Sequence, residues 1–182
     1  MHAIKWTLSD TSPNVNWETQ TLFGLQRMRN PVFTAGMRFA TFLANSSTLT
    51  LFALLAFVLP VLNTVASPLA IALLSGVAGA QIVKRRVRRA RPRRSIAGLI
   101  PIGEDPDSFS MPSGHTTAAF AGALVLATLP GWGLGAVSIA CLVGLSRMYM
   151  GVYYPTDVLV GTALGSLCTT VARAIATYLP AF

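Results

Sequence analysis

Three short blocks of this chain contain residue types that bind phosphate. The first is Lys84 followed, seven positions on, by Arg91. The second is the tetrapeptide Pro112–His115, and the third is the stretch Ser146–Asp157. An arginine fork donates two hydrogen bonds to phosphate oxygens, whereas a lysine acts as a point charge. We therefore predict that Lys84, Arg91 and Arg147 bind one dianionic phosphate group.

A simpler interpretation exists for the first block. The basic run Lys84–Arg94 directly follows an apolar stretch, and such runs often hold a membrane protein in its orientation. That interpretation accounts for Arg85, Arg86, Arg88 and Arg89. It does not account for Arg147, which is isolated in an otherwise apolar stretch. We therefore assign phosphate binding to the three spaced cations and orientation to the remaining arginines.

The second block opens an apolar stretch that is predicted to be a helix. Free N–H groups at a helix N-terminus bind anions, and a glycine permits close approach of the backbone. Ser113 and Gly114 are therefore predicted to bind phosphate oxygens. A single histidine near the end of an apolar span is more often structural, but within this tetrapeptide we favour a chemical role for His115.

The three blocks together resemble the signature of the type 2 phosphatidic acid phosphatase superfamily, which includes lipid phosphatases and vanadium haloperoxidases. That signature reads K-x6-R-P, P-S-G-H and S-R-x5-H-x3-D, and this chain matches every defining position except one. The resemblance implies a metal-independent reaction without a cofactor, in which a histidine attacks phosphorus and water hydrolyses the phosphohistidine. It also implies that His115 protonates the leaving oxygen and that Asp157 orients the nucleophile. The nucleophilic histidine of the family falls on Tyr153.

Tyr153 changes the expected chemistry. A neutral imidazole is a competent nucleophile at about pH 7, whereas a phenol with a pKa of about 10 is not unless that pKa is lowered. Tyrosine is also longer than histidine, so its oxygen does not take the place of the imidazole nitrogen. Asp157 is then expected to accept the phenol hydrogen, to pair with an arginine, or only to interact with the dipole of its helix. Three interpretations stay open: a binding protein without turnover, a variant made to block turnover, and an enzyme with another nucleophile.

An acidic cluster separates the first two blocks. Glu104, Asp105 and Asp107 are of the type that binds hard cations. A polar, solvated loop explains them adequately, and the resemblance implies no metal. We therefore predict no metal site there.

Composition indicates a membrane protein. The chain of 182 residues is 53% hydrophobic and 11% charged, against about 25% charged residues in ordinary soluble domains. The net charge is +8, and the basic residues lie between apolar runs. Anionic lipid head groups and phosphate substrates are therefore the expected partners, and nucleic acid is not.

The fold expected is an all-α integral membrane domain that spans residues 1–182. A span needs about 17–25 mostly apolar residues. Five segments are predicted to cross the membrane, with antiparallel hairpins at Asn63–Ser67 and Pro130–Gly131: Ser47–Thr64, Pro68–Val83, Thr116–Leu129, Trp132–Met148 and Thr156–Tyr178. Traced along the chain, five spans bring four helix ends and all three blocks to one face.

The N-terminal part, residues 1–45, is predicted to lie in the membrane interface. Trp17–Arg29 and Pro31–Asn45 mix apolar residues with arginines and read as short amphipathic helices, anchored by Trp17, Phe23 and Phe33. The alternative is a sixth span through Phe33–Leu43.

A pair of glycines, Gly161 and Gly165, lies in the last predicted span. We predict close helix packing inside the monomer rather than a dimer contact, and the oligomeric state stays open.

The predicted function is that of a membrane lipid-phosphate phosphatase, impaired by Tyr153. Candidate substrates are phosphatidic acid, phosphatidylglycerol phosphate, and polyprenyl phosphates or diphosphates. The alternatives are a non-catalytic protein that binds a lipid phosphate or a partner, and a lipid phosphotransferase.

The expected location is the inner or plasma membrane. The positive-inside rule places the face with the three blocks in the cytoplasm, because Arg173 is the only basic residue toward the other side.

Overall fold

The computed structural model describes residues 16–103, 105 and 107–178, and all regular structure among these residues is helical. The all-α prediction is confirmed for this part of the chain. The helices are α1 (Trp17–Arg27), α2 (Pro31–Leu43), α3 (Ser46–Val58), α4 (Pro60–Val87), α5 (Pro92–Ser95), α6 (Gly114–Leu126), α7 (Gly133–Tyr149) and α8 (Pro155–Ala176).

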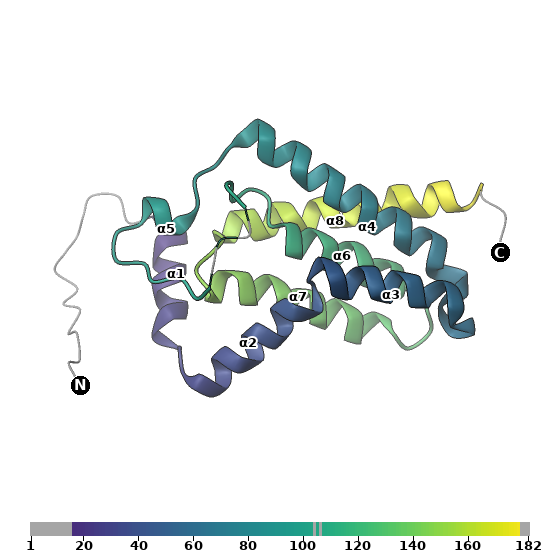
Figure 1. Cartoon of the computed structure of the whole chain (residues 1–182), viewed down its shortest axis with the longest axis horizontal. Coiled ribbons are helices and arrows are strands. Elements are labelled where there is room, and N and C mark those ends of the chain that lie inside the picture. The colour runs from purple at the N-terminus through teal and green to yellow at the C-terminus, as the bar shows by residue number, and fades with distance from the viewer. Residues whose placement is uncertain (1–15, 104, 106, 179–182) are drawn as a thin grey trace.

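Helices α3, α4, α6, α7 and α8 run side by side as a bundle (Figure 1). Helix α6 packs against α4, α7 and α8. The core along α4 and α6 is built largely from small residues, among them Ala66, Ala72, Ala118 and Ala121. Small side chains let helix backbones approach closely, which is the usual way to pack helices where lipid removes the hydrophobic driving force.

Helices α6 and α8 approach each other at the two glycines of the last span. A Cβ at Gly161 would lie 2.8 Å from the carbonyl oxygen of Ser113, and a Cβ at Gly165 would collide with the carbonyl oxygen of Thr117. The backbone N–H of Ser113 donates to the carbonyl oxygen of Asp157 at 3.0 Å. The predicted packing inside the monomer is therefore present, and it joins the beginnings of the two helices.

Each of the five predicted spans corresponds to a helix, but one predicted boundary is wrong. The chain turns at Leu59, and Asn63–Ser67 lies inside α4. Leu59 is extended because the residue before a proline avoids the helical conformation, and Pro60 then fits the first helical turn. Pro68 is accommodated inside α4 instead of starting a helix.

The number of spans stays a prediction. By length and composition, two long helical stretches in the described residues qualify, Pro60–Ser95 and Pro155–Ala176. The pair α2 and α3 qualifies as a third if both form one span with a bend of 51°. Helices α6 and α7 are apolar but shorter.

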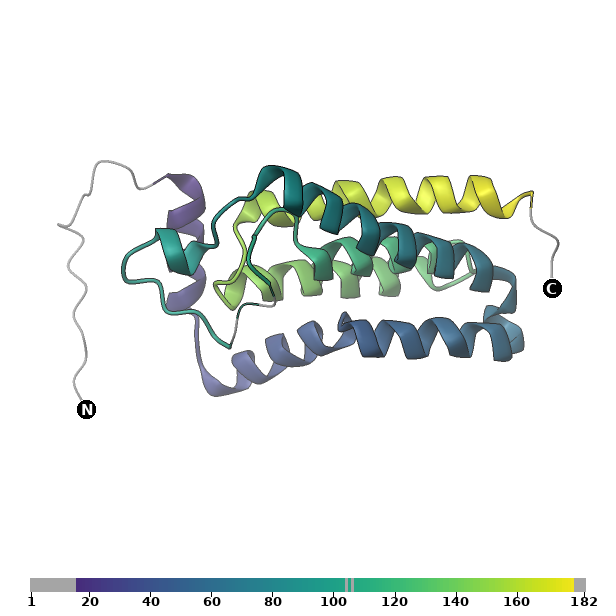
Figure 2. The same cartoon turned by 45° about the horizontal axis from the view of Figure 1, so that its top comes forward.

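Helices α1 and α2 form where the two N-terminal helices were predicted. Asn16 and Asn30 cap them, each accepting a hydrogen bond from a backbone N–H of the first turn. Helix α1 lies across the end of the bundle, and α2 runs from there to α3 (Figure 2). Phe33, predicted to be a membrane anchor, packs edge-on against Tyr149 of α7 at 5.1 Å between ring centroids.

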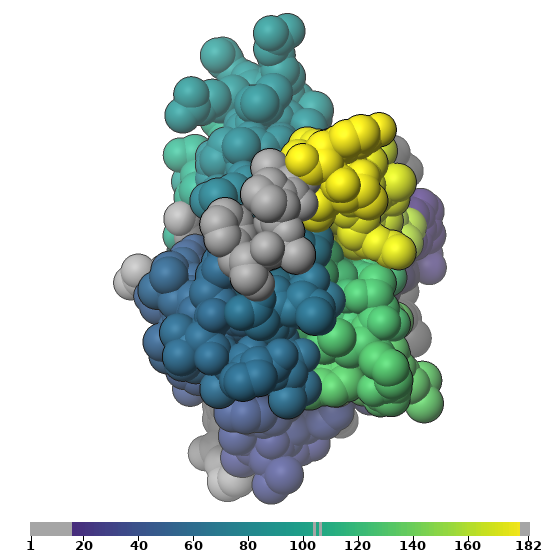
Figure 3. All heavy atoms as spheres, turned by 90° about the vertical axis from the view of Figure 1, so that its right-hand side faces the viewer, coloured from purple at the N-terminus to yellow at the C-terminus, as the bar shows by residue number. Residues whose placement is uncertain are grey.

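The two ends of the bundle differ in what they bring together. The end of the bundle that is farther from α1 carries the start of α4 and the end of α8 (Figure 3). The end beside α1 carries the C-terminal ends of α4 and α7 and the N-terminal ends of α6 and α8 (Figure 1). These are the four helix ends that the sequence places on one face.

Candidate phosphate-binding site

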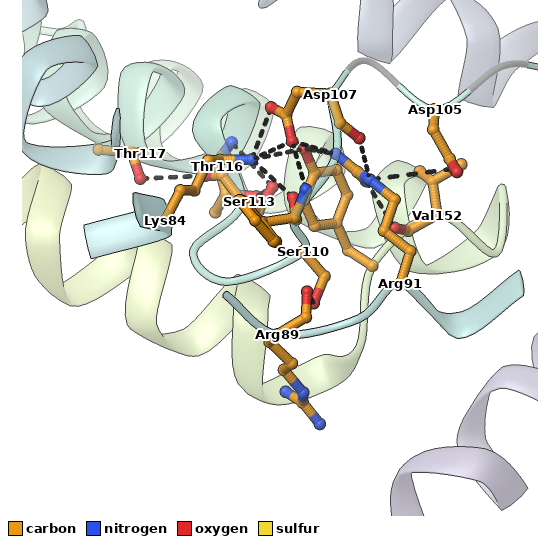
Figure 4. Close-up of polar contacts among 12 residues, drawn as sticks. Lys84, Arg89, Arg91, Asp105, Asp107, Ser110, Ser113, Thr116, Thr117 and Val152 are labelled. Atoms are coloured by element: carbon orange, nitrogen blue, oxygen red, sulfur yellow. Dashed lines mark hydrogen bonds and ion pairs between the residues drawn. The ribbon is translucent and has the colours of Figure 1, made fainter. Parts of the chain in front are cut away.

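Lys84 and Arg91 are buried where α4 leaves the bundle (Figure 4). Lys84 is 3% exposed, and Arg91 is fully buried. The guanidinium of Arg91 donates to the carbonyl oxygens of Val152 at 2.9 Å and Asp107 at 2.7 Å. Two loops thus fix the orientation of the guanidinium through backbone carbonyls.

The anion that meets both cations is a carboxylate of the protein itself. Lys84 Nζ donates to Asp107 Oδ2 at 2.7 Å and Oδ1 at 3.0 Å, and Arg91 Nη2 donates to Oδ1 at 2.8 Å. Burial tends to raise the pKa of Asp107, but the hydrogen bonds and charges of Lys84 and Arg91 outweigh it and lower that pKa below its ordinary value. The solvated-loop interpretation is wrong for Asp107, whose side chain is 34% exposed and paired.

The rest of the acidic cluster contributes less. Asp105 Oδ1 lies 4.0 Å from Arg91 Nε, and Asp105 Oδ2 lies 3.9 Å from Arg93 Nη1. Glu104 lies outside the described residues. Whether this cluster could bind a metal ion therefore depends on Asp107, and the carboxylate of Asp107 is already paired with two cations.

Tyr153 lies at the centre of the three spaced cations. Its side chain is 1% exposed, and its hydroxyl oxygen lies 3.3 Å from Arg91 Nη2 and 3.5 Å from Lys84 Nζ. The guanidinium carbons of Arg91 and Arg147 lie 4.6 Å and 5.4 Å from the ring centroid. The phenol therefore accepts hydrogen bonds from cations that were predicted to bind phosphate.

Arg147 is a buried cation without a carboxylate partner among the described residues. It is 4% exposed, and its Nε has no hydrogen-bond partner. Its Nη1 makes only long contacts, to Thr41 Oγ1 at 3.4 Å and to Met150 Sδ at 3.8 Å. Moving an ion into a protein interior without a partner costs on the order of several kcal/mol. The site therefore carries a positive charge that one more anion would compensate.

The tetrapeptide Pro112–His115 begins α6 as predicted. The Ser113 hydroxyl caps the helix, accepting from the Thr116 N–H at 3.4 Å and from the Thr116 hydroxyl at 2.8 Å. The Ser113 hydroxyl is therefore engaged in capping the helix, and the Ser113 N–H donates to the carbonyl oxygen of Asp157. Gly114 lines a groove, with open space where a Cβ would be, so its N–H is the better placed of the two for an anion.

His115 lines the same groove as Gly114. Its Nε2 lies 3.1 Å from Asn45 Oδ1. An acceptor oxygen at this position favours the tautomer with the proton on Nε2. Asn45 stands at the break between α2 and α3, and it makes no side-chain cap on α3. The N-terminal half of the chain thereby contacts the predicted general acid.

Asp157 is fully buried and pairs with an arginine, one of the expected alternatives. Its Oδ1 accepts from Arg89 Nη1 at 2.9 Å, and its Oδ2 accepts from the backbone N–H of Tyr154 at 2.8 Å. Arg89 also donates to Glu18 Oε2 at 2.7 Å and stacks over the ring of Tyr154 at 3.9 Å. The phenol of Tyr153 is directed instead toward Lys84 and Arg91.

Arg89 is the site residue that sequence reasoning missed. It was grouped with the orientation-setting arginines, and that interpretation is wrong for Arg89. Figure 4 shows its side chain pointing away from Asp107 and Arg91, toward the other side of the loop. Nothing in the local sequence distinguishes it from Arg88, because its partners Glu18 and Asp157 lie on distant helices.

An apolar groove leads away from the cations. It has a volume of about 400 Å³, and one end is lined by Lys84, Asp107, His115 and Tyr153. The remainder is lined mostly by apolar residues of α3 and α4, including Leu54, Phe57, Leu74 and Val77. The arrangement joins a cationic head site to an apolar channel.

A membrane-type helical bundle with Lys84, Arg91 and Arg147 buried at one end is the arrangement that the three signature blocks predict. Residues 65–180 match the PAP2 superfamily, and the chain belongs to it. The resemblance predicted from the three blocks is confirmed.

Relatives of this chain are phosphatases of lipid and polyprenyl phosphates. It is 41% identical over 88 residues to decaprenylphosphoryl-5-phosphoribose phosphatase of Mycobacterium tuberculosis, covering 48% of each chain. It is 36% identical over 89 residues to undecaprenyl-diphosphatase of Sulfolobus acidocaldarius, covering 47% of this chain and 43% of the relative. Lipid A 1-phosphatase of Rhizobium etli is 33% identical over 104 residues, covering 52% and 44%. The chain thus spans about half the length of these relatives.

Two solved structures have the same fold. A transmembrane phosphatidylglycerolphosphate phosphatase from Bacillus subtilis matches with a TM-score of 0.74 and 24% identity, over 90% of this chain and 86% of that one. LpxE of Aquifex aeolicus matches with a TM-score of 0.76 and 22% identity, over 93% and 99%. The protein is therefore an integral membrane protein of this fold.

Proposed function

We propose that this protein binds the terminal phosphate of a membrane lipid and hydrolyses it weakly or not at all. The observation that carries the proposal is Arg147, a buried guanidinium with an unpartnered Nε that lies against the ring of Tyr153, a residue lining the polar end of the groove. A phosphate oxygen supplies the missing acceptor, and charge-assisted hydrogen bonds of this kind are among the strongest in proteins.

The apolar groove supports a lipid as the ligand. Its polar end contacts the cations, and its walls on α3 and α4 suit a hydrocarbon chain. Candidate ligands are phosphatidic acid, phosphatidylglycerol phosphate, and polyprenyl phosphates or diphosphates. Among these, polyprenyl phosphates are favoured because relatives act on decaprenyl and undecaprenyl compounds by name.

Weak turnover follows from the surroundings of Tyr153. A phenol becomes a nucleophile only when a base takes its proton or its pKa is lowered. The Asp157 carboxylate is engaged by Arg89 and by the Tyr154 N–H. The phenol oxygen itself accepts from Arg91 and Lys84, the cations that a bound phosphate needs. Cations that bind phosphate oxygens do less to activate the phenol.

The test is phosphate release by the detergent-solubilised chain from a panel of lipid phosphates, beside a Tyr153→His variant. We expect little release by the unmodified chain and a large gain for Tyr153→His. A nucleophile in such a site is worth a factor of about 10⁶ in kcat. Candidate acceptor alcohols added to the same assay report phosphotransfer.

Two results contradict the proposal. Robust turnover by the unmodified chain that Tyr153→Phe abolishes makes the phenol the nucleophile. A Tyr153→His variant that folds and binds phosphate yet releases none favours the alternative of a non-catalytic binding protein.

A further inference from the structure

The cation site contains an internal competitor for anions. Asp107 places one carboxylate against both Lys84 and Arg91, with three contacts between 2.7 and 3.0 Å (Figure 4). The Phe109 N–H donates to the same carboxylate at 3.1 Å, which holds it in place from its own loop. Asp107 and Lys84 both line the groove, so the carboxylate stands at its polar end, against the cations that a ligand entering from the groove would meet.

An incoming phosphate therefore has to exchange with Asp107 at two of the three cations. The carboxylate carries one negative charge and two acceptor oxygens. A ligand with the same charge and the same number of acceptor oxygens gains no binding free energy at Lys84 and Arg91. It replaces one monoanion by another and loses its own hydration. Only Arg147 lacks such a competitor among the described residues.

Membrane lipids differ in the charge of their phosphate groups. A phosphodiester head group is a monoanion with two free oxygens. A terminal phosphate monoester carries a charge of about −1.5 to −2 at pH 7 and three free oxygens, since its second pKa is about 6. The monoester can displace Asp107 with a net gain in charge, whereas the diester cannot.

We propose that Asp107 is a specificity-determining residue that selects terminal phosphate monoesters against phosphodiesters. The inference rests on the proposed function, because it requires that this site binds phosphate. Discrimination by a repulsive group is a common device where an unwanted ligand is abundant, and phosphodiesters are abundant in a membrane.

The charged and titratable groups that face Asp107 come from several elements. Lys84 belongs to α4, Arg91 precedes α5, and Asp105 shares the loop of Asp107. His115 of α6 and Tyr153 line the same end of the groove. Lys84 and Arg91 hold the pKa of Asp107 below its ordinary value, so Asp107 stays ionised between pH 5 and 7.5 while the ligand changes its charge.

The test compares Asp107→Asn with Asp105→Asn in the full chain, purified in an uncharged detergent. The two changes remove the same charge from the same loop, but Asp105 makes no contact with Lys84 and approaches Arg91 only to 4.0 Å. The ligands are methyl phosphate, a monoester, and dimethyl phosphate, a diester, and the measured quantity is Kd at pH 7.5.

We expect the unmodified chain to prefer methyl phosphate. Asp107→Asn should tighten dimethyl phosphate binding by about tenfold or more, which corresponds to 1.4 kcal/mol, and narrow the ratio of the two Kd values. Asp105→Asn should leave that ratio within about twofold of its original value, because the Asp105 carboxylate lies 4.0 Å from Arg91 Nε and does not hold the position that the phosphate takes. Asp107→Ser, which removes the carboxylate without placing an amide there, should shift the ratio in the same direction.

A second readout separates charge selection from a structural role. At pH 5 methyl phosphate becomes a monoanion, so its affinity for the unmodified chain should fall toward that of dimethyl phosphate, with a smaller fall in Asp107→Asn. An unchanged ratio in both Asp107 variants, or a loss of both ligands in folded variants, overturns the role of Asp107. If the unmodified chain and all variants bind neither ligand, the proposed function fails with it.

Discussion

At the scale of single residues, the site combines paired and unpaired cations. Lys84 and Arg91 share Asp107, whereas Arg147 has no carboxylate among its described contacts. This asymmetry makes Arg147 the residue whose charge a ligand compensates most. Tyr153 also lies against Arg147, with the guanidinium carbon 5.4 Å from the ring centroid, but a neutral phenol does not compensate the charge of Arg147 as a carboxylate would.

We predict that Arg147→Ala weakens phosphate binding more than any other single cation change in the site. Hydrogen bonds to charged groups contribute about 1.5–3 kcal/mol each, so loss of two bonds raises Kd by at least about a hundredfold. Binding of inorganic phosphate or vanadate to the solubilised chain measures the effect.

The matched control is Arg86→Ala, because Arg86 is an exposed arginine of the same basic run. Arg89 is not a suitable control, since it pairs with Asp157. If Arg86→Ala weakens phosphate binding as much as Arg147→Ala does, the basic run acts collectively and the assignment to Arg147 is wrong.

At the scale of elements, the beginnings of α6 and α8 are held together by the glycines of α8. We predict that Gly165→Ala lowers the thermal stability of the solubilised protein, because the new Cβ collides with the Thr117 carbonyl. Overpacking of this kind costs about 1–3 kcal/mol. A thermal unfolding curve in detergent measures the change.

Gly135→Ala is the matched control for that prediction. Gly135 also lies in a helix, α7, but a Cβ there would meet no atom within 4 Å. Alanine is favoured over glycine in a helix by roughly 0.5–1 kcal/mol, so this variant should be neutral or more stable. Equal losses of stability in both variants would argue against close packing of α6 and α8.

Helix α1 is tied to the site by Glu18. Burial tends to raise the pKa of Glu18, but hydrogen bonds from Thr156 and Arg89 and the charge of Arg89 lower it below 4.5 overall. A carboxyl whose pKa is lower in the folded state stabilises the fold above its unfolded pKa, which is about 4.3 for a glutamate, and that contribution is lost as the pH falls through the folded pKa.

We therefore predict that Glu18→Gln lowers the melting temperature at pH 7 and that the difference from the unmodified chain shrinks as the pH falls below about 4.5. Melting curves from pH 3 to 8 in one detergent test this. A difference that stays constant across that range would show that the ionised carboxylate contributes nothing.

At the scale of the whole molecule, all three blocks lie at one end of the bundle, beside α1. The arginines that the site does not use, such as Arg85, Arg86 and Arg94, lie in the same part of the chain. By the positive-inside rule we predict that this end faces the cytoplasm. Lys5, which also counts toward this charge, lies outside the described residues.

Cysteine labelling measures the orientation. In a variant that lacks Cys141 and Cys168, Ile100→Cys reports on the end with the site and Tyr178→Cys on the opposite end; these positions are 64% and 89% exposed. A membrane-impermeant reagent should label only Tyr178→Cys in intact cells, and both after permeabilisation. Labelling of Ile100→Cys in intact cells would reverse the orientation.

The sequence by itself determined the fold class, the family and the positions of the spaced cations. Apolar runs of sufficient length become helices in a membrane because every backbone polar group must be paired within the segment. The signature positions depend on local spacing around helix ends, so Lys84, Arg91 and Arg147 could be assigned without a structure. The same spacing predicts that Tyr153 stands where the family signature has histidine.

Only the tertiary structure decided how the charges are paired. Glu18 and Arg89 are 71 positions apart, and Asp107 reaches Lys84 across a loop whose path no local pattern specifies. An ion pair depends on where side chains end in space, and many arginines of one run were equal candidates. The turn at Pro60 was decided in the same way, because both Pro60 and Pro68 fit the start of a helix and packing of α3 on α4 selects between them.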